Sequence, residues 1–293
     1  MPKSKPALSV VIPCYNEQDA IADTVTRITD TLADTVPFEL IIVDDGSTDG
    51  TSETLTGIAA DQPALRLSRH ERNRGYGAAL KTGIAMADAE MVVITDADGT
   101  YPIDRIPDLL DAADGFDMVV GARTGESVDY PFIRRIPKLF LAGYASWIVG
   151  ERIPDINSGL RLFRKSAVER YLHLLPNTFS FTTTITIAML TDNRQVRFVP
   201  INYHRRVGHS KIQPIRDTLR FFHLILRTGI YFAPLRAFAP IILGFGLGFL
   251  ASLFHDLFVI RDITDKTLIL LTFTLNLGLF ALLADLIDKR MRR

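Results

Sequence analysis

The sequence predicts an α/β protein, in which a doubly wound, mostly parallel sheet is followed by amphipathic helices at a membrane surface and by a C-terminal two-helix transmembrane hairpin. Three observations support this prediction. Short apolar runs alternate with helical patterns over residues 1 to about 125, which is typical of a parallel sheet with helices on both faces. Basic amphipathic stretches come next. Two long apolar runs come last.

The strands and helices of the N-terminal half can be placed one by one. Buried strands are expected at Leu8–Ile12, Phe38–Val43, Leu65–Leu67, Met91–Thr95 and Met118–Gly121. Helices are expected at Ile21–Leu32, Thr48–Ala60 and Gly77–Ala87, and we expect Asn16 to cap the first of them. The polar turns after the first, second and fourth strands lie at one edge of the sheet, so their side chains converge there.

Residues 126 to 235 have a less regular pattern. Two stretches, about 130–149 and 214–232, combine basic and apolar residues at helical spacing. This pattern is typical of helices that lie at a membrane surface. Ordinary core packing with snorkelling arginines is the alternative.

Composition changes near residue 235. Residues 237–258 and 267–287 each contain an apolar run that reaches the roughly 20 residues needed to cross a bilayer. We therefore divide the chain into residues 1–235 and a membrane hairpin of residues 236–293. Basic residues flank the hairpin at Arg227, Arg236, Lys289, Arg290, Arg292 and Arg293. The positive-inside rule then predicts a multi-pass cell-membrane protein with both termini and residues 1–235 in the cytoplasm.

Charge and cysteine content narrow the function classes. Lys plus Arg and Asp plus Glu both number 33, so net charge gives no reason to expect a nucleic acid or an acidic partner. Cys14 is the only cysteine, which excludes an internal disulfide and fits a reducing compartment. The N-terminus runs straight into a predicted strand, so no secretory signal is expected.

The segment Asp96-Ala97-Asp98-Gly99 follows directly after the apolar run Met91–Ile94. Two carboxylates therefore sit just past the carboxyl end of a predicted central strand, where open α/β sheets bind ligands. Such a pair can share one hard divalent cation, and the cation can hold a diphosphate. The segment taken alone fits an acidic turn equally well.

Several motifs occur in an order that resembles one known family. They are Val11–Glu17, Val43–Thr51, Asn73–Gly77, Asp96–Gly99, Asn157–Gly159 and His204–Lys211. Over roughly residues 7 to 235 the chain resembles family 2 glycosyltransferases with a GT-A fold. It is most similar to the polyprenyl-phosphate glycosyltransferase subgroup, which is dolichyl-phosphate mannose synthase-like. The glycine pattern Gly75-Tyr76-Gly77 imitates a dinucleotide fingerprint, but the third glycine is missing and the pattern follows the third predicted strand, so we reject that site.

The resemblance implies a reaction. A sugar would pass with inversion from a nucleotide-diphosphate sugar, GDP-mannose or a UDP-hexose, to a polyprenyl or dolichyl phosphate, with Mg²⁺ or Mn²⁺ as cofactor. An acceptor phosphate is already anionic, so no strong general base is needed. Two alternatives stay open: a glycolipid synthase that uses a lipid hydroxyl, with Asp155 as base, and a non-catalytic membrane scaffold. Homo-oligomerisation is also left open.

The resemblance also assigns roles to residues of this chain. Asp96 and Asp98 would bind the metal, and Thr100 stands where relatives use a glutamine. The donor nucleotide would contact Pro13, Tyr15, Glu17, Val43, Asp44 or Asp45, Arg72, Arg74 and Ala97. Gly75 and Gly77 would let the backbone approach the phosphates. Asp155, Arg205, Arg206 and Lys211 would join the catalytic set. The acceptor phosphate would contact Arg134, Arg135, Lys138, Asn157 and Ser210.

Overall fold

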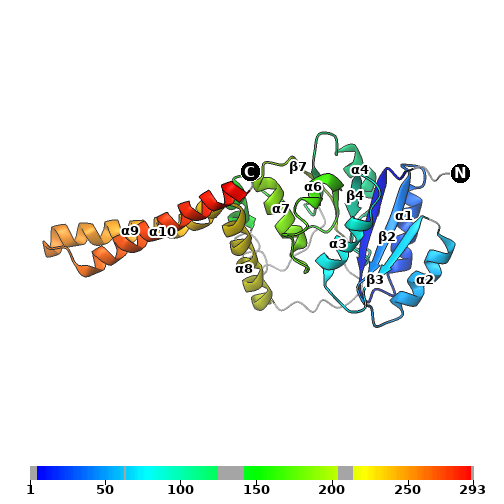
Figure 1. Cartoon of the computed structure of the whole chain (residues 1–293), viewed down its shortest axis with the longest axis horizontal. Helices are drawn as coiled ribbons and strands as arrows, with labels where there is room; N and C mark the ends of the chain where they lie inside the picture. The colour runs from blue at the N-terminus through cyan, green and yellow to red at the C-terminus, as the bar shows by residue number, and fades with distance from the viewer. Residues whose placement is uncertain (1–4, 63, 125–141, 204–213, 292–293) are drawn as a thin grey trace.

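The fold has a globular part built on one sheet and a long helical hairpin that projects from it (Figure 1). The computed structural model describes residues 5–62, 64–124, 142–203 and 214–291, with the backbone alone for 214–222, 288 and 291. The N-terminus lies at the end of the molecule far from the hairpin. The C-terminus returns to the base of the hairpin, beside α8 (Figure 1).

Seven strands form one sheet in the order β3-β2-β1-β4-β6-β5-β7. Their bounds are β1 Leu8–Cys14, β2 Phe38–Asp44, β3 Leu65–Arg69, β4 Met91–Ile94, β5 Met118–Ala122, β6 Arg161–Arg164 and β7 Val196–Pro200. The pairs β1–β2, β2–β3, β1–β4 and β5–β7 are parallel, whereas β6 is antiparallel to β4 and β5. The carboxyl ends of the parallel strands and the beginning of β6 therefore share one edge, which we call the rim.

Helices connect and cover these strands. Their bounds are α1 Ile21–Leu32, α2 Thr51–Asp61, α3 Tyr76–Met86, η1 Ile103–Arg105, α4 Ile106–Asp111, α6 Lys165–Glu169, α7 Phe181–Thr191, α8 Pro214–Phe232, α9 Pro234–His255, η2 Asp256–Ile260 and α10 Asp265–Met291. Residues 142–149 are also helical. The strands bury both faces, because alternate residues of β1 enter different clusters: Val10 packs with α1 and Val11 packs with α3 and α7.

The structure confirms the predicted alternation of strands and helices, with ends that shift by up to three residues. The expectation that Asn16 caps α1 is wrong. The helix begins at Ile21 after Ala20, and Asn16 adopts a left-handed conformation with φ 56°. Its side chain instead binds the next turn, because Asn16 Oδ1 accepts from the Thr48 backbone amide at 2.8 Å. The prediction had also missed β6, β7 and α7, which lie in the less regular region.

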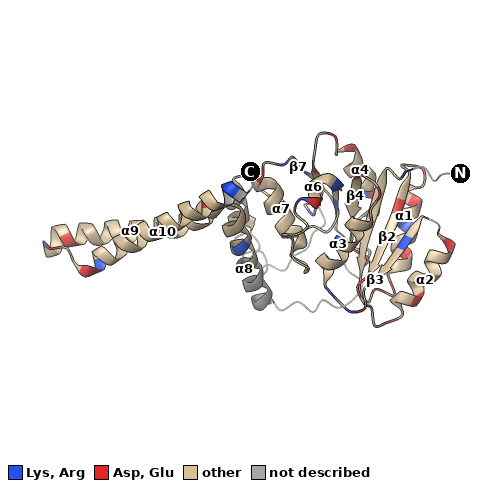
Figure 2. Ribbon diagram, viewed as in Figure 1, with Lys and Arg blue, Asp and Glu red and all other residues tan. Residues whose placement is uncertain are grey.

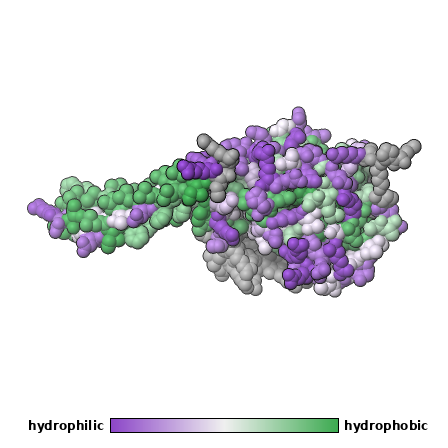
Figure 3. Space-filling model, viewed as in Figure 1, coloured by the Kyte–Doolittle hydropathy of each residue, from purple (hydrophilic) through white to green (hydrophobic). Residues whose placement is uncertain are grey.

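The hairpin consists of two segments that are long and apolar enough to span a membrane, Pro234–Ile260 and Asp265–Ile287. Its surface is almost uniformly apolar, in contrast to the mixed surface of the globular part (Figure 3). Charged residues of the hairpin gather at its tip and at its base (Figure 2). At the tip, Asp256 Oδ2 accepts from the Thr264 amide at 2.8 Å and from the Thr267 hydroxyl at 2.7 Å, which ties the two segments together.

The base of the hairpin is bonded to the helix of residues 142–149. The Arg236 guanidinium donates to the carbonyls of Ile148, at 3.1 Å, and Val149. In return the Trp147 indole donates to the Arg236 carbonyl at 3.0 Å. A cation at the carboxyl end of a helix is favourable, because the last carbonyls there lack partners within the helix.

The amphipathic helix predicted at 214–232 is α8, and its later turns bury Ile225 and Phe232 in the core. Most of the stretch 130–149 lies outside the described residues, and its part 142–149 is helical. Contact of either helix with a membrane surface stays a prediction.

Candidate active site

A cavity of about 350 Å³ opens at the rim of the sheet, and we call it the rim cavity. The loops after β1, β2, β3 and β4 and the loop before α7 all contribute to its wall. Its lining consists of Pro13, Cys14, Tyr15, Glu17, Asp45, Asn73, Gly75, Tyr76, Ala79, Asp96, Ala97, Asp98 and Phe179. The expected convergence of side chains at this edge is therefore present.

Asp96 and Asp98 line the same cavity, two and four residues past the end of β4. The buried Thr100 orients Asp98, because its backbone amide and its hydroxyl both donate to Asp98 Oδ1, at 3.1 and 2.7 Å. Thr100 is fully buried and does not line the cavity. In this structure its hydroxyl is directed at Asp98.

Tyr76 and Phe179 form an aromatic wall beside Asp96. The Tyr76 hydroxyl donates to Asp96 Oδ1 at 2.9 Å. Burial and the nearby carboxylate of Asp96 raise the pKa of Tyr76, so its hydroxyl stays protonated and able to donate. The ring of Phe179 stacks on that of Tyr76 with centroids 5.2 Å apart, although Phe179 itself is 80% exposed. Such an exposed aromatic ring at the mouth of a cavity offers a flat apolar surface to a ligand.

The two carboxylates at the end of β2, Asp44 and Asp45, have different surroundings. Asp44 is buried away from the cavity, where it accepts from the Ser47 amide at 2.9 Å and from the Ser52 hydroxyl. Asp45 lines the cavity. Its Oδ1 accepts from the Arg74 amide at 3.0 Å and lies 2.6 Å from His70 Nδ1.

The Asp45 carboxylate also fixes the loop between β3 and α3, because its Oδ2 accepts from the Gly75 amide at 2.7 Å. The glycines of this loop were expected to let the backbone approach phosphates. That role stays a prediction. Both glycines also approach another loop of the chain: a Cβ at Gly77 would lie 2.2 Å from the Pro176 carbonyl oxygen, and one at Gly75 would lie 2.3 Å from that of Asn177. The glycines therefore allow close contact with the loop that carries Phe179.

Asp155 and Asn157 bind Arg123 beyond the end of β5. Arg123 donates from Nε to Asp155 Oδ2 at 2.7 Å and from Nη2 to Asp155 Oδ1 at 2.9 Å. Arg123 Nη2 also donates to Asn157 Oδ1 at 2.6 Å. This bidentate pair is nearly buried, and such a pair stabilises only while both partners are present. Both carboxylate oxygens of Asp155 thus accept bonds from Arg123.

Two tyrosines extend this network from Arg123 towards Asp96. The Arg123 guanidinium lies 5.3 Å from the ring centre of Tyr203, and Tyr203 packs edge-on against Tyr101. The Tyr101 hydroxyl accepts from the Gly159 amide at 2.6 Å. Gly159 permits this close packing, because an added Cβ would lie 2.9 Å from Asp96 Oδ1 and the Asp96 side chain would have to shift. The segment before β6 is therefore packed directly against Asp96.

A completely buried arginine supports the segment before β6. Arg161 donates to the carbonyls of Ser158 and Ile156 at 2.7 and 2.9 Å and to the Thr186 hydroxyl at 2.6 Å. Burial lowers the pKa of Arg161 to about 10, partly offset by the charge of Asp155. Arg161 therefore fixes residues 156–158 at the rim.

The rim cavity fits a divalent cation that is bound together with a phosphate group. No cluster of three or more His, Cys, Asp or Glu side chains suited to a metal occurs within the described part of the chain. Asp96 and Asp98 supply two oxygen-bearing side chains. Mg²⁺ is typically held by one or two carboxylates plus substrate phosphates and water. The site thus has the donor set of a cation that arrives with a diphosphate.

The other predicted residues lie in several places. Pro13, Tyr15, Glu17 and Ala97 line the rim cavity. The Val43 side chain is buried in the core against α3, so only its backbone is available to a ligand. Arg72 and Arg74 are exposed on the loop after β3. Arg134, Arg135, Lys138, Arg205, Arg206, Ser210 and Lys211 lie outside the described residues.

Sequence reasoning missed Arg123, Tyr76 and Phe179. Arg123 follows β5 at the same rim as Asp96, so the rule applied to the first, second and fourth strands could have found it. Tyr76 stands between two glycines that were considered only for their backbone. No local signal points to Phe179, because its loop reaches the cavity through tertiary packing alone.

The mixed seven-stranded sheet with acidic residues at its rim defines an α/β fold of the GT-A class. The model of the family described as "Glycosyl transferase family 2" matches residues 9–172. The chain belongs to this family and is a glycosyltransferase.

Similar curated proteins act on lipid phosphates. A dolichyl-phosphate hexose transferase of Haloferax volcanii is 31% identical over 71% of this chain and 87% of its own length. An undecaprenyl-phosphate 4-deoxy-4-formamido-L-arabinose transferase of Edwardsiella ictaluri is 32% identical over 88% of this chain and 77% of its own length. An undecaprenyl-phosphate mannosyltransferase of Micrococcus luteus is 26% identical over 69% of this chain and 86% of its own length.

A solved structure shares the fold. Glucosyl-3-phosphoglycerate synthase from Mycobacterium tuberculosis, crystallised with Mn²⁺, UDP and glucosyl-3-phosphoglycerate, is 20% identical. The match has a TM-score of 0.57 and covers 78% of this chain and 80% of that chain. At this identity the similarity shows the GT-A-type architecture of the globular part.

Proposed function

We propose that this glycosyltransferase moves a hexose-type sugar from a nucleotide diphosphate to the phosphate of a polyprenyl lipid, with inversion at the anomeric carbon. The relatives named above support the lipid-phosphate acceptor. The observation that carries the proposal is that Asp96 and Asp98 line one cavity with Tyr15, Glu17 and Asp45, at the rim of the sheet. That cavity offers acidic ligands for a metal beside a wall for a nucleoside.

The donor would be held by the loops after β1, β2 and β4. Tyr15 and Pro13 supply apolar contact for the nucleoside, and Asp45 is the carboxylate of its pair that lines the cavity. We therefore assign base recognition to Asp45 and a structural role to Asp44. A cation bound by Asp96 and Asp98, Mg²⁺ or Mn²⁺, would neutralise charge on the leaving diphosphate.

The protein's own groups position the reactants. Tyr76 and Thr100 fix the two carboxylates through hydrogen bonds, which prepares the site before the donor arrives. The acceptor phosphate is anionic near neutral pH and attacks without loss of a proton. The basic residues Arg134, Arg135, Lys138, Arg205, Arg206 and Lys211 are proposed to neutralise the two phosphates as they approach.

The rival acceptor, a lipid hydroxyl, would need a general base. Asp155 was the candidate, and it accepts bonds from Arg123 through both carboxylate oxygens. That arrangement favours a positioning role for Asp155 over proton abstraction. Direct competition between polyprenyl phosphate and diacylglycerol as acceptors separates the two reactions.

We also propose that the two apolar segments cross the cell membrane as a hairpin, with the catalytic part and both termini in the cytoplasm. The basic residues at the base of the hairpin and the uncharged middle of both segments support this topology (Figure 2).

The decisive experiment measures transfer of radiolabelled sugar to undecaprenyl phosphate by the wild type and by Asp98→Ala with added Mg²⁺ or Mn²⁺. The variant should lose at least about 1,000-fold in rate, because the leaving diphosphate loses its main electrostatic stabilisation. Asp104→Ala, at a solvent-exposed position on η1, is the matched control and should retain full activity. Full activity of Asp98→Ala would contradict the proposal. Failure of the wild type to bind any nucleotide in the presence of metal would support the scaffold alternative.

A further inference from the structure

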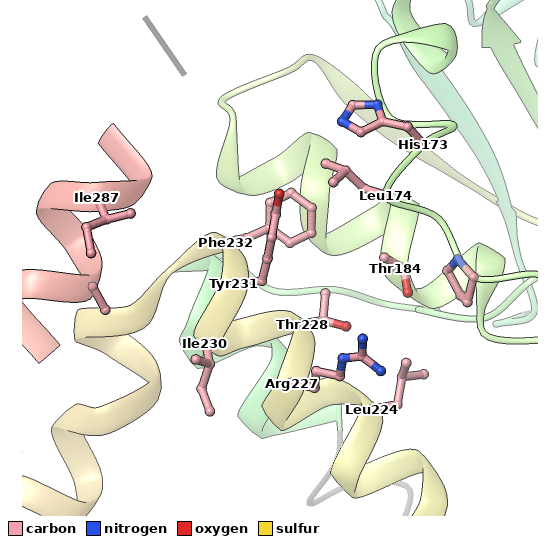
Figure 4. Close-up of a pocket in the computed structure, with 12 residues that line it drawn as sticks. His173, Leu174, Thr184, Leu224, Arg227, Thr228, Ile230, Tyr231, Phe232 and Ile287 are labelled. Carbon is pink, nitrogen blue, oxygen red and sulfur yellow. The ribbon is translucent and has the colours of Figure 1, made fainter. Parts of the chain in front are cut away.

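A second and larger cavity, of about 660 Å³, lies where the globular part meets the hairpin, and we call it the junction cavity. Its wall combines the loop before α7, the helices α7 and α8, and the last turns of α10. Figure 4 shows side chains from all of these elements around one hollow. Both the globular part and the hairpin therefore contribute to the wall of this cavity.

The two ends of the junction cavity differ in polarity. Ile230 and Ile287 lie on the side of α10, whereas Thr184 and Arg227 lie on the side of the globular part (Figure 4). Most of the exposed lining is apolar, and Leu174 extends the apolar wall. A ligand that matches this wall is an amphiphile with its polar end towards Thr184 and its apolar end towards the hairpin.

The Thr184 hydroxyl indicates that this cavity binds a ligand. Thr184 is 5% exposed, and its Oγ1 has no hydrogen-bond partner in the structure. A buried hydroxyl without a partner costs free energy of folding, because its hydrogen bonds to water are lost on burial. A bound phosphate oxygen would satisfy Thr184, and the neighbouring Arg227 guanidinium would balance the charge.

The junction cavity and the rim cavity share a loop. Pro176 lines the junction cavity, and Phe179, three residues later, lines the rim cavity beside Tyr76. This loop is held in place by Lys81, which donates to the Leu175 carbonyl and to Asn177 Oδ1. A lipid that extends from the hairpin to the reaction centre would pass along this loop.

We propose that the junction cavity binds the acceptor polyprenyl phosphate, with its phosphate end towards Thr184 and Arg227 and its first isoprene units between Ile230 and Ile287. This inference rests on the proposed function and adds to it the site and orientation of the lipid. An isoprenoid is favoured over a bilayer phospholipid because one loop lines both this cavity, through Pro176, and the rim cavity, through Phe179, where sugar transfer would take place.

The test uses undecaprenyl phosphate with a diazirine on the isoprene next to the phosphate, photolysed with the full-length protein in detergent without any donor. Crosslinks should map to peptides that contain Leu174, Ile230 or Ile287. Excess unlabelled undecaprenyl phosphate should suppress them, and phosphatidylglycerol should not. Crosslinks confined to the outer surface of the hairpin, or equal suppression by phosphatidylglycerol, would overturn the proposal.

Two valine substitutions on α7 provide a matched pair. Thr183 and Thr184 are both buried with unpartnered hydroxyls, and Thr184 alone of the two lines the cavity. Neither substitution should lower Tm, because neither removes a hydrogen bond within the protein. Thr184→Val should reduce crosslinking yield and raise KM for undecaprenyl phosphate roughly tenfold, with KM for the donor unchanged, whereas Thr183→Val should leave all three unchanged.

A second pair tests the apolar end. Ile230→Trp fills the cavity and should reduce crosslinking at least fivefold, whereas Ile269→Trp, on the exposed surface of α10, should not. Equal effects within both pairs would refute the site. Sugar transfer without crosslinks in the cavity would refute this inference alone, and specific crosslinks without any transfer would refute the proposed function alone.

Discussion

At the scale of single residues, the carboxylates of the rim are held by neighbours before any ligand binds. Asp96 accepts from Tyr76, Asp98 from Thr100, Asp45 from the loop after β3, and Asp155 from Arg123. A carboxylate that is already oriented loses little conformational freedom when a cation or a nucleotide binds. The carboxylates of the rim are therefore held in fixed orientations before a ligand binds.

Tyr76→Phe tests this arrangement. The substitution removes the hydroxyl that donates to Asp96 at 2.9 Å and keeps the ring that stacks on Phe179. We expect the concentration of Mg²⁺ or Mn²⁺ needed for half-maximal transfer to rise roughly tenfold, since partners that orient a metal ligand typically contribute that much. Tyr171→Phe is the matched control, because it loses a similar bond, to Asp192 at 2.8 Å, outside the rim cavity. An unchanged metal requirement in Tyr76→Phe would contradict the role of this hydrogen bond.

At the scale of elements, glycines in α3 control how closely the loop before α7 can approach. A Cβ at Gly77 would lie 2.2 Å from the Pro176 carbonyl oxygen, so the loop must move if a side chain is added. Gly77→Ala should destabilise the protein by about 1–3 kcal/mol and weaken donor binding, because the loop carries Phe179. Gly57 in α2 has nothing within 4 Å of its Cβ position. Gly57→Ala should therefore stabilise by up to about 1 kcal/mol, and chemical denaturation of both variants measures the contrast.

A buried carboxylate in β2 makes strand packing sensitive to acid. Burial alone would raise the pKa of Glu39, but hydrogen bonds from the Ser9 hydroxyl, the Asp88 amide and Arg66 outweigh burial and lower that pKa. The stability that Glu39 contributes is therefore present above its unfolded pKa, near 4.5, and is lost as pH falls through the lower folded pKa. Denaturation from pH 6 down to pH 3 should show this loss. Its slope should be smaller in Glu39→Gln than in the wild type, and the exposed Glu53→Gln serves as control.

The elements that sequence patterns located are those with strong local signals. The strands β1, β2 and β4 consist mainly of apolar residues, with Ser9, Glu39 and Asp44 as the exceptions, and their burial on both faces follows from that composition. The strand β6 escaped prediction because it contains the buried Arg161, whose charge is satisfied by carbonyls and a hydroxyl from other segments. The strand β7 is only five residues long, Arg197 interrupts its apolar residues, and it ends at Pro200.

The sequence could predict those residues of the candidate site that come at or just after the end of a strand. Asp96, Asp98 and Asp45 come directly after predicted strands, and all three line the rim cavity. The sequence could not show which of Asp44 and Asp45 faces the cavity. Neighbouring side chains at the end of a strand point in different directions, and the path of the following loop decides which of them meets the cavity. The role of the loop before α7 depends on contacts between residues about 100 positions apart, Gly77 and Pro176, which no local pattern encodes.

At the scale of the whole molecule, the single cysteine makes membrane topology directly measurable. Cys14 is buried, and burial raises the pKa of its thiol, so the wild type should resist maleimide labelling. In Asp262→Cys, at the hairpin tip, the thiol should react with a membrane-impermeant maleimide in intact cells. In Glu71→Cys, at an exposed position of the globular part, it should react only after lysis. Labelling of Glu71→Cys in intact cells would contradict the proposed orientation.

The reciprocal bonds between Arg236 and the segment Trp147–Val149 bear on how the enzyme selects lipids. In the proposed topology these bonds attach the base of the hairpin to the globular part, so the rim cavity would stay at a fixed distance from the bilayer. In the proposed reaction the enzyme would then contact the phosphate and the first isoprene units of the lipid, and not the far end of its tail. Acceptors that differ only in overall length should consequently compete on equal terms.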